Sequence, residues 1–583
     1  MEFKKLSYYL TKSKIIKPHE NLKKIRLSFL GSYSLNGFEE TIKVLCNEEN
    51  ISCSTYVGGY NQFFQEIFDE NSGWHKFESD ITFLMLDSKK ILGELYYYPY
   101  DLSIDQRKKF INEKFNELKK LIEIVNLKSK SRLVISNFLI PTFSPFGIYE
   151  YKTEYGLKEM LIDLNQKLLD YSRELDYVFI FDFNSFVTKF GENQIFDYKK
   201  IFSGDLQISF NYIPILVNEF LSYIKPVLGL TKKCIVLDLD NTIWGGIVGE
   251  DGFNGIKLGP DPLGQPFVEL QKILKSFSKR GVILAINSKN NFDDAMKVIT
   301  EHPYMELRKD DFSSIRINWN DKISNIKEIS SELNIGLDSI IFVDDDPSNR
   351  ELIKTALPKV KVIDLPDDPS QYPKILRELD DFHLLKITND DFHRIEMYSQ
   401  QQKRNTLMEN STNIDEFLKK LNIKVKLCKA NTFAIPRISQ LTIKTNQFNL
   451  TTKRYQEKDI KDLIDDSNIF LGYAEVSDKF GNNGITNVFI FKTNGSDWYL
   501  DTFLLSCRIM GKKIENLILG KLLEYAKNKG AKKIIAEYIP TEKNKPIEDF
   551  LFLNGFEKEK EHWIFTYNKP IKIPEFIEVE MFE

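Results

Sequence analysis

Two aspartates stand directly after a short apolar run near the middle of this 583-residue chain. The run is Cys234–Leu237, and Asp238 and Asp240 follow it, two residues apart. A short apolar run is typical of a buried parallel strand, and open α/β sheets place their chemistry at the carboxyl ends of such strands. The Asn241-Thr242 pair can turn the backbone there, so that the second carboxylate swings back toward the first. The sequence therefore predicts a parallel sheet with a carboxylate pair at its edge.

A second apolar run, 282–286, ends in small polar groups. The pattern predicts another strand of the same sheet, bounded by Gly281 and Lys289. We expect Ser288 to hold a phosphate oxygen beside Asp238, and Asn287 and Lys289 to contact the substrate.

Two more motifs follow in order. Lys322 opens a segment in which Ile323, Ile326, Ile329 and Leu333 have helical spacing, and a lysine at the start of such a helix can reach an anion. A third apolar run, 339–343, ends in Asp344 and Asp345, whose oxygens suit a hard cation. Each motif alone also fits solvated strand ends and a surface lysine, but four motifs in this order favour one active site.

The four motifs resemble those of the haloacid dehalogenase-like phosphohydrolases, over roughly residues 229–370. The resemblance implies a Rossmann-like domain in which Asp238 takes the phosphoryl group and Asp240 acts as acid and base. It also implies that Mg²⁺ is held by Asp238, the main-chain carbonyl of Asp240, Asp344 and Asp345. A carboxylate nucleophile divides phosphoryl transfer into two steps, and a cation with Lys322 offsets the charge on the transferring group.

Glycines crowd the segment 244–264, between the first two motifs. They predict a tight, backbone-rich hairpin over the site and leave no room for a separate cap domain. An uncapped site favours a substrate carried on a macromolecule over a small free phosphate ester.

Two segments resemble the FkbH-like proteins: the string DLDNTIWGGIVGEDG at residues 238–252 and the stretch 440–452. The resemblance to this family extends over nearly the whole chain. That family combines a phosphatase with a C-terminal acyltransferase-like domain. The resemblance implies loading of a glyceryl unit from 1,3-bisphosphoglycerate onto a phosphopantetheinylated acyl carrier protein, as in polyketide biosynthesis, with loss of phosphate.

Length and composition agree with a multidomain cytoplasmic enzyme. The chain of 583 residues exceeds what one core usually supports, and its 42% hydrophobic content is ample for several cores. A net charge of −4 argues against nucleic-acid binding. Five scattered cysteines without a CxxC pair indicate neither a disulfide framework nor a structural zinc site. No apolar run is long enough for a membrane span or a signal peptide.

Residues 1–228 alternate apolar runs with helical patterns, which predicts a doubly wound α/β domain similar in layout to the SGNH hydrolases. In a catalytic interpretation Ser32 or Ser34 would be the nucleophile. The expected histidine base is missing, because residues 176–228 contain none. We therefore favour a scaffold or docking role for this domain.

Residues 371–583 form a charged helical connector and an α+β domain. From Lys419 to Lys461 there are eleven Lys and Arg residues against two acids. Such a run is often just a solvated face, but here it can also bind an anionic partner, with Lys444 contacting the substrate.

A strand pattern at 498–507 runs into Arg508 and Gly511 and then into an amphipathic helix, which together make an anion cradle. The arrangement resembles the acyl-CoA loop of GNAT acyltransferases, in which Arg508 opens an R-x-x-G-x-G/A pattern. Lys513 replaces the final small residue, which weakens the case for the pyrophosphate contact of CoA. A protein-borne pantetheine lacks that pyrophosphate.

Cys507 lies between this strand and Arg508. It is either a buried strand cysteine or a thiol activated by a cation and a helix N-terminus, which could carry the glyceryl unit as a thioester. An alternative for the whole chain is a Mg²⁺-dependent phosphatase of a small phosphorylated sugar or polyol with a separate N-acyltransferase domain. A non-catalytic scaffold is disfavoured by the intact phosphatase motifs.

Overall fold

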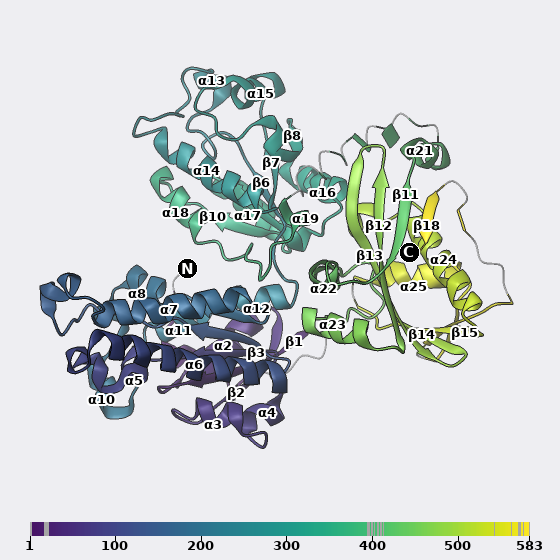
Figure 1. The fold of residues 1–583 in the computed structure, drawn as a ribbon. Coiled ribbons are helices and arrows are strands. Elements are labelled where there is room, and N and C mark those ends of the chain that lie inside the picture. The colour runs from purple at the N-terminus through teal and green to yellow at the C-terminus, as the bar shows by residue number, and fades with distance from the viewer. Residues whose placement is uncertain are drawn as a thin grey trace. The chain divides into compact units, whose positions relative to one another are not determined.

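The computed structural model describes residues 3–16, 22–392, 397, 400, 403–404, 407–408, 411, 413–541, 543–560, 562–568, 573–574 and 577–581. The chain divides into two compact units, residues 1–228 and 229–583. The second unit holds two sheets (Figure 1). Two parallel sheets and one mixed sheet confirm the predicted α/β multidomain class.

The N-terminal unit is built on a five-stranded parallel sheet of order β2-β1-β3-β4-β5. Its strands are β1 (Lys23–Gly31), β2 (Ile51–Val57), β3 (Ile81–Met85), β4 (Arg132–Ser136) and β5 (Val178–Phe181). Its helices are α1 (Leu6–Lys12), α2 (Phe38–Glu48), α3 (Phe63–Phe68), α4 (Gly73–Phe77), α5 (Ser88–Leu92), α6 (Ile104–Lys128), α7 (Leu157–Arg173), α8 (Phe183–Phe190), α9 (Glu192–Ile195), α10 (Tyr198–Gly204), α11 (Ile213–Glu219) and α12 (Leu221–Val227).

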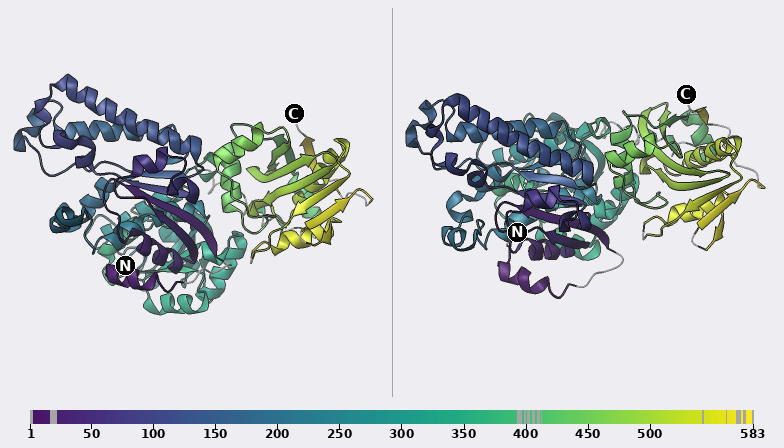
Figure 2. Two further views of the ribbon diagram at one scale, coloured as in Figure 1. Left: turned by 90° about the horizontal axis from the view of Figure 1, so that it is seen from below. Right: turned by 60° about the horizontal axis from the view of Figure 1, so that its bottom comes forward.

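Alternation of side chains along the strands divides this unit into two cores. Leu30 and Leu84 pack with the long helices α6 and α7, which lie together on one face of the sheet in both views of Figure 2. Phe29 and Phe83 point to the other face, where the Phe83 ring stacks on Phe220 with 4.3 Å between centroids. The doubly wound layout that the sequence predicts is thus present.

The middle sheet is also parallel and has the order β10-β9-β6-β7-β8. Its strands are β6 (Cys234–Leu237), β7 (Ile283–Ser288), β8 (Phe312–Ile317), β9 (Ile340–Asp344) and β10 (Lys361–Asp364). Its helices are α13 (Val248–Asp251), α14 (Gln265–Lys279), α15 (Phe292–Glu301), α16 (Lys322–Glu332), α17 (Pro347–Ala356) and α18 (Tyr372–Arg377), and the short α19 (Asn389–Phe392) follows. All strand residues of β6 and β7 are buried, as expected for a sheet covered on both faces.

The C-terminal domain has an eight-stranded mixed sheet of order β16-β17-β15-β14-β13-β12-β11-β18. Its strands are β11 (Lys424–Lys429), β12 (Ile469–Asp478), β13 (Gly481–Asn494), β14 (Asp497–Leu505), β15 (Lys533–Glu537), β16 (Glu557–Glu559), β17 (His562–Thr566) and β18 (Glu578–Met581). Its helices include α21 (Ile414–Leu421), α22 (Ile435–Lys444), α23 (Glu457–Asp465), α24 (Ile514–Asn528) and α25 (Lys545–Leu553).

Strands β14 and β15 separate part of the way along their length. They pair in parallel only as far as Leu500 and Ala536, whereas β14 continues to Leu505. The segment 448–450 fills this fork: Leu505 N–H donates to the Phe448 carbonyl at 3.0 Å, and Ile539 N–H donates to the Leu450 carbonyl at 3.0 Å. Part of the stretch 440–452 is therefore used to complete the sheet.

Asp501 is a buried carboxylate beside this fork. It accepts hydrogen bonds from Lys453 at 2.8 Å and from the Tyr455 hydroxyl at 2.5 Å, and Lys492 pairs with it at 2.8 Å. Burial alone would raise the pKa of Asp501, but these contacts outweigh burial and lower the pKa to about 2. The side chain is 2% exposed, so solvent screens the contacts little.

We expect Asp501→Asn to destabilise the C-terminal domain by about 2 kcal/mol at neutral pH, the equivalent of the lowered pKa. Because the pKa is lower in the folded state, the contribution of Asp501 is complete above the pKa of an unfolded aspartate, about 4, and disappears as the pH falls toward 2. Urea unfolding, monitored through hydrogen exchange of peptides from β14, measures this contribution as a function of pH. The account is contradicted if the difference in free energy of unfolding between wild type and Asp501→Asn does not become smaller below about pH 4. Asp497→Asn, at a half-exposed ion pair on the same strand, is the matched control and should cost under about 1 kcal/mol.

Candidate active site

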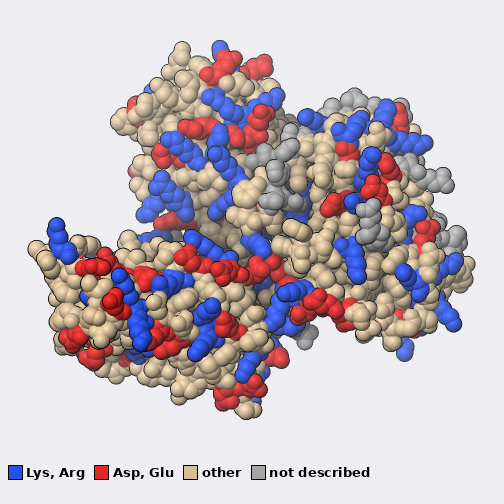
Figure 3. Space-filling view, viewed as in Figure 1, with Lys and Arg blue, Asp and Glu red and all other residues tan. Residues whose placement is uncertain are grey.

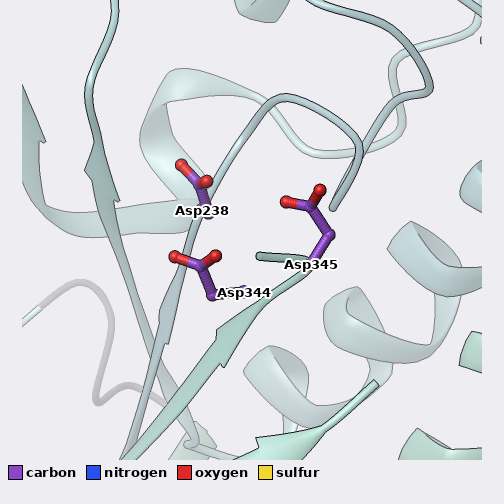
Figure 4. Close-up of side chains that lie close together, drawn as sticks. All are labelled: Asp238, Asp344 and Asp345. Atoms are coloured by element: carbon purple, nitrogen blue, oxygen red, sulfur yellow. The ribbon is translucent and has the colours of Figure 1, made fainter. Parts of the chain in front are cut away.

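The predicted phosphatase residues meet at one edge of the middle sheet. Asp238 follows β6, Ser288 ends β7 and Asp344 ends β9, and β6 lies between the other two strands. Because all these strands run parallel, their carboxyl ends share one edge. Figure 4 shows the carboxylates of Asp238, Asp344 and Asp345 around one space.

Lys322 joins two of these carboxylates. Its ammonium group lies 2.9 Å from Asp238 Oδ2 and 2.5 Å from Asp344 Oδ2. The Lys322 side chain is 2% exposed and that of Asp344 is fully buried. Burial alone would lower the pKa of Lys322, but the charges of the two carboxylates outweigh it and raise the pKa. The lysine therefore stays charged at the bottom of the site.

Local structure fixes the position of this lysine. Asp321 caps α16, because its carboxylate accepts the Ser324 N–H at 2.8 Å, so the helix begins at Lys322. Asn287 holds the Lys322 carbonyl through its Nδ2 at 2.9 Å, and its own Oδ1 accepts from Asn325 at 3.0 Å. Asn287 is fully buried, and these contacts occupy its amide. The structure thus shows Asn287 supporting Lys322, and contact with the substrate stays a prediction.

Asp238, Asp344 and Asp345 form a group that can hold a metal ion. One carboxylate oxygen from each lies within 4.8 Å of the others. Asp238 Oδ1 is buried and has no hydrogen-bond partner among the described residues. A cation bound to this oxygen would compensate for the missing partner. Burial and the charges of Asp238 and Asp344 raise the pKa of Asp345 to about 6. Burial and the Asp238 charge likewise raise the pKa of Asp344, against the opposing charge of Lys322.

A set of contacts holds the two acids after β9. Asp344 Oδ1 accepts the Asp346 N–H at 2.9 Å and the Asn349 amide at 3.3 Å. The Arg350 guanidinium donates to the main-chain carbonyls of Asp344 and Asp345 at 2.8 and 2.6 Å. Contacts of this kind orient metal-binding carboxylates before a cation arrives.

Asp240 lies in different surroundings from the acidic triad. Its Oδ1 accepts from Trp244 Nε1 at 2.8 Å and from the Val248 N–H at 3.0 Å, and its Oδ2 accepts from Asn290 Nδ2 at 2.7 Å. Burial raises its pKa, although these hydrogen bonds partly oppose the shift. A carboxyl group with a raised pKa suits proton transfer. The predicted metal contact through the Asp240 main-chain carbonyl stays a prediction.

The turn after β6 explains how Asp240 reaches its partners. Asn241 adopts left-handed backbone angles with φ +53°, and its side chain accepts the Gly246 N–H at 2.8 Å. The predicted turning role of the Asn241-Thr242 pair is thus present, and Thr242 also bonds Asp345 at 3.2 Å. The segment 238–264 runs through the short α13 directly into α14 and contains no inserted domain.

Asn290 is a site residue that the sequence does not reveal. It is 5% exposed and donates to Asp240 across 50 residues of sequence. Its neighbour Ser288 is buried at the end of β7, as expected for a group beside Asp238, while Lys289 is exposed. The polar run 287–290 predicts a site but not which amide faces which acid.

Ser32, which a catalytic interpretation of the N-terminal unit would use as nucleophile, is occupied in packing. Ser32 is 1% exposed, and its hydroxyl accepts the Asp87 N–H at 2.8 Å. Gln207 donates to the Asp87 carboxylate at 2.9 Å, and Lys90 pairs with Asp205 and donates to the Ser32 carbonyl. These contacts link the ends of β1 and β3 and support the scaffold interpretation.

Much of the predicted basic stretch is engaged within the chain. Lys444 pairs with the fully buried Asp391 at 3.2 Å, and Lys453 bridges Asp501 and Glu537. Burial lowers the pKa of Arg454 to about 10, and its guanidinium donates to main-chain carbonyls. In Figure 3, positive and negative side chains are interspersed over the face in view. A substrate contact by Lys444 stays a prediction.

Cys507 begins a 3₁₀ turn, Cys507–Ile509, directly after β14 and Ser506. Its side chain lies outside the described part of the structure, so its predicted role as acyl carrier stays a prediction. Arg508 and Gly511 follow in the loop that leads to α24, as expected. Among the described helices, none is both long and apolar enough to cross a membrane.

Comparisons with known proteins agree with this geometry. Residues 26–225 match the family model for the FkbH N-terminal domain. A solved structure of the N-terminal part of the protein BF1531 from Bacteroides fragilis, containing a phosphatase domain complexed with Mg, is 29% identical. The alignment covers 66% of this chain and 100% of that chain, with a TM-score of 0.60. The chain thus contains an FkbH N-terminal domain and is similar to a solved protein with a phosphatase domain, so the predicted resemblance to FkbH-like proteins is confirmed.

The C-terminal region aligns with N-acetyltransferases. The PaiA N-acetyltransferase from Thermoplasma acidophilum, solved with coenzyme A, is 14% identical over 24% of this chain and 96% of that chain, with a TM-score of 0.20. A GNAT-family acetyltransferase from Staphylococcus aureus Mu50 gives 14% identity, coverage of 24% and 98%, and the same TM-score of 0.20. The comparison with curated proteins found no match.

We predict that Mg²⁺ raises the melting temperature of the protein, and that Mg²⁺ affinity falls about fourfold between about pH 7.5 and pH 5.5. The sign follows from the pKa of Asp345, about 6 without metal: below it the carboxyl is protonated, and a proton must leave before the cation binds. Thermal shift against Mg²⁺ concentration measures both effects. Asp345→Asn should weaken binding, whereas the exposed Asp367→Asn should match wild type. Equal affinity at both pH values would show that Asp345 is not a ligand.

Proposed function

We propose that this chain loads a glyceryl unit from 1,3-bisphosphoglycerate onto an acyl carrier protein and removes the remaining phosphate at Asp238. The resemblance to FkbH-like proteins supports the substrate and carrier. The site supports the phosphatase step. The observation that carries it is Lys322 between Asp238 and Asp344, with Asp238 Oδ1 buried and unpaired.

In this proposal Asp238 acts as the nucleophile. One carboxylate oxygen of Asp238 would attack phosphorus, with the Lys322 ammonium group 2.9 Å from Oδ2. The new bond joins that carboxylate oxygen to phosphorus, while the bond from phosphorus to the ester oxygen of the glyceryl unit breaks. Lys322 offers positive charge next to the transferring group, and Ser288 can hold one of its oxygens.

Mg²⁺, which we expect Asp238, Asp344 and Asp345 to hold, would supply further positive charge against the phosphoryl oxygens. The magnesium in the Bacteroides fragilis phosphatase structure supports this assignment. The buried, unpaired oxygen of Asp238 and the oxygen-only set of ligands fit a hard cation.

Asp240 is placed to transfer protons in both halves of the reaction. Its raised pKa favours a protonated carboxyl that gives its proton to the leaving ester oxygen. The resulting carboxylate then takes a proton from the water that attacks the aspartyl-phosphate, which releases phosphate and restores Asp238. Trp244, Val248 and Asn290 fix the direction of the carboxyl group throughout.

The acyl transfer concerns the other phosphate of the substrate. The sulfur of the carrier's pantetheine thiol forms a bond to the C1 carbonyl carbon, the bond from C1 to the phosphate oxygen breaks, and the thiol proton leaves with the released phosphate. The GNAT-like C-terminal domain is the proposed place of this step. Cys507 would either carry the glyceryl unit first or leave the carrier thiol to attack directly.

The open site is consistent with a carrier-borne substrate. The segment 238–264 contributes no domain that would close over Asp238. A glyceryl phosphate at the end of a flexible arm could therefore reach the carboxylates while its carrier protein remains outside.

Intact-mass spectrometry of a carrier protein incubated with this chain, Mg²⁺ and 1,3-bisphosphoglycerate tests the proposal. Wild type should yield a dephosphorylated glyceryl adduct on the carrier. Asp238→Asn should release none of the ester phosphate and should accumulate a phosphorylated glyceryl adduct, because the nucleophile is lost. An unmodified carrier with wild type, or normal phosphate release by folded Asp238→Asn, would refute the scheme.

The same assay decides the role of Cys507. If it carries the acyl group, Cys507→Ala should load no carrier yet still hydrolyse a small phosphate ester at Asp238. Cys507→Ser should also transfer poorly, because an alkoxide forms less readily than a thiolate. If either variant loads the carrier at the wild-type rate, Cys507 does not carry the acyl group. Another nucleophile, or direct attack by the pantetheine thiol, would then account for the transfer.

A further inference from the structure

The loop between β14 and α24 has the features of an anion-binding site. It contains Arg508, Lys512 and Lys513, and it ends at the first turn of a 15-residue helix. Free amide N–H groups at the start of a helix attract phosphate groups. Gly511 has φ +75° and Lys513 has φ +59°, so two left-handed residues bend the backbone just before the helix.

A carboxylate of the chain already occupies part of this loop. Glu515, in the first turn of α24, accepts the Gly511 N–H through Oε1 at 3.2 Å. Its Oε2 is buried and has no hydrogen-bond partner among the described residues. An acidic side chain thus takes the place that a phosphate oxygen would take against this amide.

The cations of the loop also point to partners inside the chain. Lys512 is 8% exposed, and its ammonium group donates to the Arg508 carbonyl at 3.1 Å. The Arg508 Nε donates to Ser506 Oγ at 3.3 Å. Arg404, a buried arginine whose charge acts on Lys512, forms an ion pair with Asp478 at 2.6 Å. Arg508 and Lys512 thus have partners within the chain, while Glu515 places a carboxylate against the Gly511 amide.

We propose that Glu515 is a specificity-determining residue that bars thiols carrying a diphosphate, such as coenzyme A, from the C-terminal domain. An entering diphosphate would have to displace the Glu515 carboxylate from Gly511 and would meet its negative charge at close range. A pantetheine arm on a carrier protein has a single phosphodiester and no diphosphate. The inference rests on the proposed acyl transfer in this domain and restricts the acceptor thiol to one borne by a carrier protein.

Calorimetric titration of the full-length chain with coenzyme A in EDTA tests the proposal. Glu515→Ala frees the Gly511 amide and removes the charge, so we expect at least about tenfold tighter coenzyme A binding than in wild type. Glu515→Gln, which keeps the size of the side chain, should give a smaller gain. Phosphopantetheine, which lacks the diphosphate, should bind all three proteins equally. Glu524→Gln, at an exposed ion pair on the same helix, is the matched control and should behave as wild type.

Two results would overturn the role of Glu515. Glu515→Ala could bind coenzyme A no better than wild type, or the variant could gain as much affinity for phosphopantetheine as for coenzyme A. The titration needs neither phosphate release nor carrier loading. Its failure therefore leaves the proposed function standing, whereas failure of the carrier-loading assay removes the proposed function and leaves this binding result intact.

Discussion

The buried contact of Lys322 with Asp238 and Asp344 is the interaction on which the active site depends. Removing charged groups from water is costly, so one ammonium between two carboxylates persists only because each is held by its own element. The arrangement leaves a net negative charge and one unpaired oxygen on Asp238. That net negative charge and the unpaired oxygen are the physical reason for a cation at this place.

The parallel sheet makes this contact possible. Strands β6 and β9 are neighbours, so Asp238 and Asp344 emerge side by side without any long loop. Helix α16 begins at Lys322 because Asp321 caps it, and the buried Asn287 ties that first turn to the end of β7. Asp240, by contrast, accepts hydrogen bonds from Trp244 and Asn290, just before the left-handed turn at Asn241. Two carboxylates two residues apart thereby acquire different surroundings and different chemistry.

The sequence was sufficient to predict the sheet, the four motifs and the acidic residues, because apolar runs and their polar ends are local patterns. Side-chain partners far apart in sequence were not predictable. Asn290 and Asp240 are 50 residues apart, and nothing local distinguishes Asn290 from Asn287, which faces Lys322 instead. The same limit applies to Lys444, whose partner Asp391 lies 53 residues away. The sequence places Glu515 in the first turn of a helix, but it does not predict the contact of Glu515 with the Gly511 N–H.

The most direct test of the account is to find the residue that carries the phosphoryl group. Asp240→Asn should slow hydrolysis of the aspartyl-phosphate, because no carboxylate activates the water. Rapid acid quench of this variant with a phosphate ester that has a good leaving group, followed by peptide mass spectrometry, locates the phosphate. The account predicts phosphorylation of Asp238 in the peptide that contains β6, and none in Asp238→Asn. Phosphate on Asp344 or Asp345, or no phosphorylated peptide while turnover continues, would contradict it.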